Sequence, residues 1–150
     1  PKRVCRCSIG DVQRYINRLS GPLLDRIDLH IEVPALPFHE LAQNHPSGPN
    51  SATIRSQVQE ARNRQKTRYG NVTLLNAYLD TKQLRRYCKL SDTSQQLLLH
   101  AIEHLGLSAR AYDKILRMAR TIADLENSDS ILDAHIAEAV QYRSIDLKAI

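Results

Sequence analysis

One helical stripe constrains the fold of this chain more than any other pattern in its sequence. Apolar side chains recur at intervals of three and four along residues 108–125, at Ala111, Ile115, Met118, Ile122 and Leu125. This spacing places them on one side of an α-helix. A helix with such a side is stabilised mainly by packing, so we expect residues 108–125 to lie within a helical bundle.

Start and stop signals predict further helices on both sides of this segment. Short polar residues that cap helix starts precede several periodic runs, and glycines that end helices follow two of them. The expected helices are residues 11–21, 51–70, 80–88, 91–106, 108–125 and 133–143. Their starts are assigned to Asp11, Asp80, Ser91, Ser108 and Asp133, and two of their ends to Gly70 and Gly106. In the 51–70 helix the apolar stripe is narrow and consists of Ile54, Val58 and Ala61.

Residues 27–33 follow a different pattern, in which apolar and polar side chains alternate until Pro34. Alternation predicts a strand with one buried side, made here by Ile27, Leu29, Ile31 and Val33. Prolines and glycines then cluster between residues 34 and 50. Because such clusters are typical of linkers, we place a boundary between two lobes there, and divide the chain into residues 1–45 and 46–150.

Composition narrows the class of protein. The 150 residues include 6 Tyr, 1 Phe and no Trp, which favours a core of packed helices, and the net charge of +5 favours polyanionic partners such as nucleic acid. No apolar run approaches the roughly 18 residues of a membrane span, so we expect no membrane contact. Three cysteines do not make a disulfide framework, which indicates a reducing, cytoplasmic setting. The chain begins without Met, at PKRVCRC, and we expect it to be a piece of a longer protein.

No catalytic motif for nucleotide chemistry is complete in the sequence. The phosphate-binding pattern G-x-x-x-x-G-K-[ST] is absent, and no apolar strand ends in the paired acids that hold Mg²⁺. The signatures of serine hydrolases and zinc peptidases are absent as well. We therefore expect this chain, by itself, to be inactive as an enzyme.

Two groups of side chains are candidate metal ligands. Cys5 and Cys7 supply half of a tetrahedral zinc site, with the alternative that they are two unliganded thiols. His100 and His104 are four residues apart on the polar side of their helix, a spacing that can chelate a metal. A solvated pair is the favoured interpretation of the two histidines.

Basic side chains supply the remaining candidates. Arg62, Arg64, Lys66 and Arg68 form either a solvated helix end or a patch that contacts phosphates. In the 108–125 helix the pairs Asp113–Arg117 and Arg120–Asp124 have the spacing of simple ion pairs.

Arg110 has no such explanation, because a cation in the first turn of a helix opposes the helix dipole. Its placement indicates an anion from outside the chain. Arg117 lies two turns further along the same helix.

Five stretches of the sequence together resemble the Mg-chelatase-like AAA+ ATPases, and within them the competence-related ComM (YifB) group. They are CRC, RYINRLSGPLLDRIDLHIEVPALPF, LRRYCKL, GLSARAYDKILRMARTIADL and HIAEAVQYRSID. The resemblance implies a mainly α fold. Residues 1–45 would be the last helix and strand of an α/β ATPase core, and residues 46–150 the C-terminal helical lid.

The resemblance also implies roles for particular residues. Arg26, in LLDRID, matches the arginine finger that acts on the nucleotide of a neighbouring subunit, the alternative being an ion pair with Asp25 or Asp28. Arg110 matches the sensor-2 arginine of the lid, with Arg117 as the second choice. Cys5 and Cys7 match one arm of a cysteine cluster that would bind Zn²⁺ with upstream ligands. ATP and Mg²⁺ are the cofactors implied for the intact protein.

Three functions remain open from the sequence. The first is part of an ATP-driven ring, expected to be a hexamer of identical subunits, that moves branched DNA during transformation or recombination. The second is a non-catalytic helical module that binds nucleic acid or protein. The third is a chelatase-type ATPase subunit that remodels a protein or inserts a metal. Arg26 and Arg110 favour the first and third over the second, because a simple binding module does not need them.

Overall fold

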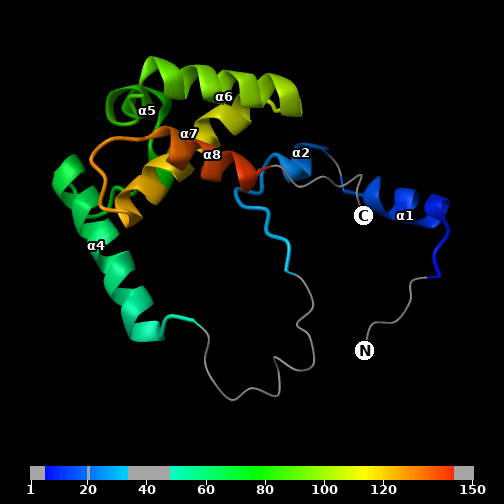
Figure 1. Cartoon of the computed structure of the whole chain (residues 1–150), viewed down its shortest axis with the longest axis horizontal. Coiled ribbons are helices and arrows are strands. Elements are labelled where there is room, and N and C mark those ends of the chain that lie inside the picture. The colour runs from blue at the N-terminus through cyan, green and yellow to red at the C-terminus, as the bar shows by residue number, and fades with distance from the viewer. Residues whose placement is uncertain (1–5, 20, 34–47, 144–150) are drawn as a thin grey trace.

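The computed structural model describes residues 6–19, 21–33 and 48–143, and every regular element in these ranges is a helix (Figure 1). The elements are α1 (Ile9–Ile16), α2 (Gly21–Leu24), α4 (Ser51–Tyr69), the 3-10 turn η1 (Asn76–Tyr78), α5 (Thr81–Tyr87), α6 (Asp92–Leu105), α7 (Ala109–Leu125) and α8 (Asp133–Gln141). The predicted mainly α fold is confirmed for the described ranges. The predicted boundary between residues 34 and 50 falls almost wholly outside them. None of the helices described is both long enough and apolar enough to cross a bilayer.

Helix α7 is the centre of the bundle and packs against α4, η1, α5, α6 and α8. Of the stripe predicted for this helix, Ala111 and Ile115 are fully buried, Ile122 is 8% exposed and Met118 is half-buried. Leu125, at the end of the stripe, is 44% exposed. The prediction of a central, one-sided helix is confirmed, and only its last position is solvent-facing.

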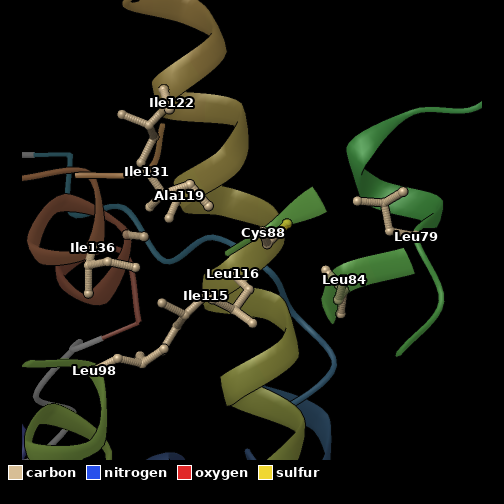
Figure 2. Packing of buried hydrophobic residues seen from close by; sticks show 12 residues of the cluster. Leu79, Leu84, Cys88, Leu98, Ile115, Leu116, Ala119, Ile122, Ile131 and Ile136 are labelled. Atoms are coloured by element: carbon tan, nitrogen blue, oxygen red, sulfur yellow. The ribbon is translucent and has the colours of Figure 1, made fainter. Parts of the chain in front are cut away.

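The core surrounds α7 on two sides (Figure 2). Leu98 of α6 and Ile136 of α8 lie near Ile115 on one side, while Leu84 and Cys88 lie on the other. All five side chains are at most 4% exposed. Burial of one Leu or Ile side chain contributes about 1.5–3 kcal/mol, so this cluster is the main source of stability of the bundle.

The capping residues predicted for the middle of the chain are confirmed. The Asp80 carboxylate accepts the Gln83 backbone N–H at 2.7 Å, and the Gln83 side chain accepts the Asp80 N–H at 2.9 Å. Ser91 accepts the backbone N–H of the residue three positions later at 3.1 Å. Gly70 and Gly106 end their helices at φ values of 63° and 61°. Only glycine adopts this left-handed conformation without steric cost, which explains why α4 and α6 end where they do.

Two predicted helix starts are wrong. Helix α1 begins at Ile9 and is capped by Ser8, whose hydroxyl accepts the Asp11 N–H at 3.2 Å; Asp11 is the third residue of the helix and not its cap. Helix α8 begins at Asp133, so the cap position belongs to Leu132. The Asp133 carboxylate instead accepts a hydrogen bond from the Ser94 hydroxyl of α6. The Asp133 carboxylate therefore binds a side chain of another helix and does not cap its own helix.

The strand predicted for residues 27–33 is wrong. None of these residues is extended in a ladder, and the side predicted to be buried is exposed, from 42% at Ile27 to 84% at Val33. A strand requires a neighbouring backbone that completes its hydrogen bonds, and the described parts of the chain offer none. The segment is bound instead to the bundle, where the His30 N–H donates to the Tyr142 carbonyl at 2.8 Å.

The apolar stripe predicted for α4 is only partly buried. Ala61 is 4% exposed, whereas Ile54 and Val58 are 47% and 44% exposed. Figure 1 shows the reason: the first half of α4 extends beyond the other helices, and only its second half crosses α7. Helix α4 therefore presents a mixed apolar and basic surface to solvent.

Candidate functional site

Arg26 follows α2 in a short irregular segment, and its side chain is exposed. Both neighbouring carboxylates have other cationic partners: Asp28 pairs with Lys114 at 2.6 Å, and Asp25 lies 3.8 Å from Arg143. The ion pairs between Arg26 and Asp25 or Asp28, considered as an alternative from the sequence, are not formed. The Arg26 guanidinium is therefore open to an anionic ligand from outside the described residues.

Two cationic side chains of the bundle donate hydrogen bonds to the backbone at and next to Arg26. The Lys114 ammonium of α7 donates to the Arg26 carbonyl at 2.6 Å. The Arg143 guanidinium, directly after α8, donates to the Ile27 carbonyl and is only 2% exposed. Nothing in the local sequence around Arg26 signals these contacts, because they join residues 88 and 116 positions apart.

Arg110 lies in the first turn of α7 and is exposed. The start of this helix differs from those of α4, α5 and α6, which are each capped by a side chain. Ser108 occupies the cap position of α7 but makes no capping bond, and its hydroxyl oxygen is buried without a hydrogen-bond partner among the described residues. No acidic residue lies in the first turn. The backbone N–H groups of this turn and the Arg110 guanidinium together make a site suited to an anion.

Arg117, the second choice for the same role, has a structural partner. Its Nε and Nη2 atoms donate to the Leu79 carbonyl at 3.1 and 2.8 Å. Its predicted ion pair with Asp113 is long, at 4.0 Å. Arg117 therefore fixes the end of η1 against α7, and Arg110 is the better candidate for an anion-binding arginine.

The basic run on α4 is divided between two sides of the helix. Arg68 forms a two-point contact with the buried carboxylate of Asp124, and Arg64 pairs with Asp129. Arg62 and Lys66 are exposed on the other side, one helical turn apart. Of the four residues considered for a phosphate-contacting patch, the alternative to a solvated helix end, only Arg62 and Lys66 are exposed, on one side of α4. Arg68 lies seven residues after Ala61 of the predicted apolar stripe, and this helical spacing was the signal that it points inward.

Asp124 is the centre of a buried polar cluster that the sequence indicated only in part. The predicted pair with Arg120 is confirmed at 3.0 Å, with both side chains at most 2% exposed. Arg68 of α4 and the Asn76 amide of η1 also donate to the same carboxylate. Burial lowers the pKa of Arg120. Burial is also the largest single influence on Arg68 and acts against its charged form, but the hydrogen bonds and charge interactions with Asp124 and Tyr69 together outweigh it, and the pKa of Arg68 is raised. Arginine has so high an ordinary pKa that both remain charged at neutral pH. The cluster joins α4, η1 and α7.

The candidate metal ligands that lie within the described residues are not gathered into one group. Cys7 is exposed, Cys5 lies outside the described residues, and no group of three potential ligands is formed within the part described. His100 and His104 are exposed and stack at a centroid distance of 6.1 Å, as expected of a solvated pair. Burial raises the pKa of Cys88 to about 11, so its thiol is protonated and poorly suited to bind a metal.

Comparison with known proteins connects these features to a family. Residues 48–143 match the family described as magnesium chelatase, subunit ChlI C-terminal, and residues 1–41 match the family described as magnesium chelatase, subunit ChlI. The first match covers α4 to α8 and Arg110. The second covers Arg26.

Individual relatives agree with the family matches. The chain is 45% identical over 141 residues to the uncharacterised protein YifB of Escherichia coli, and 46% identical over 140 residues to the competence protein ComM of Haemophilus influenzae. A protein of Mycobacterium tuberculosis is 31% identical over 140 residues. These alignments cover 93–94% of the chain but 27% of each relative's length, so the chain spans about a quarter of the proteins it resembles. The chain belongs to the Mg-chelatase-like family that includes ComM and YifB, and it corresponds to the region of these proteins that contains the ChlI C-terminal domain.

Proposed function

We propose that this chain is the lid-bearing part of an ATP-driven ring motor of the ComM type that acts on DNA. The observation that carries the proposal is the exposed Arg26 guanidinium, whose two neighbouring carboxylates are engaged by Lys114 and Arg143. An arginine held in this way by its backbone, with its charged end open, has the properties of a residue that serves a site on another subunit.

In this proposal each arginine has its own task. Arg26 stabilises the charge that develops on the γ-phosphoryl group bound by the neighbouring subunit. Its guanidinium suits this task because it is permanently charged and presents its N–H donors in a planar fork. Arg110 and the first turn of α7 bind a phosphate of the nucleotide on their own subunit. ATP with Mg²⁺ supplies the phosphoryl group, and the phosphate-binding loop and metal ligands belong to parts of the motor outside this chain.

The exposed basic side of α4 supports DNA as the substrate. Arg55, Arg62 and Lys66 are spaced by seven and four residues, so they line one side of the helix, and all three are exposed. The net charge of +5 also favours a negatively charged substrate such as DNA. A competence protein among the relatives is consistent with this choice. The chelatase name of the family keeps protein remodelling as the second candidate function.

Branched DNA is expected to stimulate ATP hydrolysis by a full-length protein that contains this chain. The double variant Arg62→Gln, Lys66→Gln should weaken DNA binding and reduce the slope of log affinity against log salt by about two, because about one unit is lost per phosphate contact. Turnover without DNA should be unchanged. The measurements are steady-state ATPase rates and DNA binding at several salt concentrations.

The matched control removes two exposed cations of α5, in the variant Lys82→Gln, Arg85→Gln. It should bind DNA like the wild type. If the control weakens binding as much as the α4 variant, general charge and not the side of α4 explains the affinity. ATP hydrolysis that no DNA stimulates favours protein remodelling, and a full-length protein that hydrolyses no ATP favours a non-catalytic binding module.

Replacement of Arg110 with alanine is expected to weaken nucleotide binding about tenfold or more, since a hydrogen bond to a charged group contributes about 1.5–3 kcal/mol. The same variant should uncouple the lid from nucleotide, so that ATP no longer protects the lid from proteolysis. Titration of the full-length protein with a fluorescent ATP analogue measures the first effect. Arg85→Ala, an exposed arginine of α5, is the control, and equal affinity in the two variants counts against the assignment.

A further inference from the structure

The segment that carries Arg26 is attached to the helical bundle by two cations, one from α7 and one from the residues after α8. We name residues 25–28 the finger segment. Lys114 of α7 contacts it at the Arg26 carbonyl and at the Asp28 carboxylate, both at 2.6 Å. Arg143 contacts it at the Ile27 carbonyl and faces the Asp25 carboxylate at 3.8 Å.

Both cations are withdrawn from solvent to make these contacts. The Lys114 side chain is 19% exposed and that of Arg143 is 2% exposed. Burial of a guanidinium is costly unless its charge and its N–H groups are matched, yet the Arg143 Nε has no hydrogen-bond partner among the described residues. If Lys114 and Arg143 served stability alone, we would expect every buried N–H group of Arg143 to have a hydrogen-bond partner. Their contacts with the backbone are better explained by a need to hold the finger segment in one position.

The position of Lys114 connects the finger segment to the candidate nucleotide site of the lid. Arg110 and Lys114 are four residues apart on α7, and therefore lie on the same side of that helix. Helix α7 is also the central helix of the bundle, packed on α4, α6 and α8. A displacement of α7 that begins at Arg110 must move the Lys114 ammonium, and with it the carbonyl of Arg26.

We propose that Lys114 and Arg143 are positioning residues that clamp the finger segment to the lid. The lid position of one subunit then determines where the Arg26 side chain lies relative to the nucleotide of the next subunit. This inference rests on the proposed function and adds a route for coupling between neighbouring subunits. Each clamp residue acts through Arg26, and neither contacts nucleotide itself.

The test uses the full-length ring with Lys114→Met, which keeps an unbranched side chain of nearly the same length but removes the charge and the donors. Turnover is expected to fall about 100-fold with unchanged nucleotide affinity, because a displacement of about 1 Å at a reacting group has a cost of this size. Lys114→Arg, which keeps a donor and a charge, should restore most of the turnover. Lys82→Met on α5 is the matched control and should have the turnover of the wild type.

A double variant separates positioning from general destabilisation. If Lys114 acts through Arg26, the variant Arg26→Ala, Lys114→Met is no slower than Arg26→Ala alone. Losses that multiply would overturn the inference.

Amide hydrogen exchange supplies a readout that does not depend on activity. Arg143→Met should accelerate exchange at His30, whose N–H bonds to the Tyr142 carbonyl, and leave the core amide of Ile115 slow. Equal acceleration at both amides would show loss of stability and not loss of the clamp.

The outcome for Arg26 distinguishes this inference from the proposed function. If Arg26→Ala retains wild-type turnover, the arginine finger and the proposed function fail together. If Arg26→Ala is slow and both Lys114→Met and Arg143→Met are fast, the clamp is refuted and the proposed function stands. Slow turnover in all three, with rescue by Lys114→Arg, supports both.

Discussion

Replacement of Arg26 with alanine is expected to lower ATP turnover of the full-length assembly by about 10³-fold or more, the usual scale for an arginine finger. Nucleotide affinity should be unchanged, because the role proposed for Arg26 is at a site on the neighbouring subunit, on charge that develops only during phosphoryl transfer. The structure favours this separation, since the Arg26 side chain is exposed and neither Asp25 nor Asp28 is its partner. Steady-state hydrolysis and equilibrium nucleotide binding measure the two quantities independently.

Arg18→Ala is the control for this experiment, because Arg18 is another exposed arginine only eight positions earlier in the chain. It should hydrolyse ATP at the wild-type rate. Arg26→Lys keeps the charge but not the planar fork, so an intermediate rate is expected. Wild-type turnover in Arg26→Ala would refute the assignment, as would an equal loss in Arg18→Ala.

Mixed assemblies test whether Arg26 acts across the subunit boundary. Subunits that lack the Arg26 side chain are combined with subunits that cannot bind nucleotide. Each kind alone should be inactive, while the mixture should recover part of the turnover wherever an intact Arg26 faces an intact nucleotide site. No recovery at any mixing ratio would indicate that the arginine and the nucleotide site must belong to one subunit.

Four helix ends that are set by neighbouring residues were predictable from the sequence. The caps at Asp80 and Ser91 and the ends at Gly70 and Gly106 each depend on backbone groups within four positions, so residue type and spacing were sufficient. The strand over residues 27–33 failed for the opposite reason. Alternation describes which side chains share a face, but a strand also needs a second backbone, and that partner is not specified by the alternating residues themselves.

The candidate site shows the same division. The role of Arg26 was identified because its local sequence context matches that of a known family, and Arg110 was identified both by such a match and by its position in the first turn of a helix, where a cation opposes the helix dipole. Lys114 and Arg143, which hold the finger segment, were not, because their partners lie far away in the chain. Arg68 was grouped with the surface cations although it lies seven residues after Ala61 of the predicted stripe and so shares the buried side of α4. Periodicity identified the side of the helix but not how far burial extends along it, because Ile54 and Val58 of the same stripe are exposed.

Asp124→Asn is expected to lower the free energy of unfolding of this chain by about 3–5 kcal/mol, the range found when one partner of a buried ion pair is removed. The asparagine amide keeps the shape of the carboxyl group and one acceptor oxygen but not the negative charge. The positive charge of Arg120, which is 2% exposed, would then remain buried without compensation, and Arg68 would lose its charged partner. Urea denaturation followed by circular dichroism measures the change.

Asp129→Asn is the matched control, because it makes the same substitution in another aspartate that pairs with an arginine of α4. The Asp129 side chain is 99% exposed, so its pair with Arg64 is screened by water and the expected loss is below about 1 kcal/mol. Equal losses in the two variants would show that the Asp124 cluster is no stronger than a surface pair. A large loss at Asp124 alone would mean that α4, η1 and α7 are joined as one unit. That rigidity is required if a displacement at Arg110 is to reach Arg26 without being absorbed within the bundle.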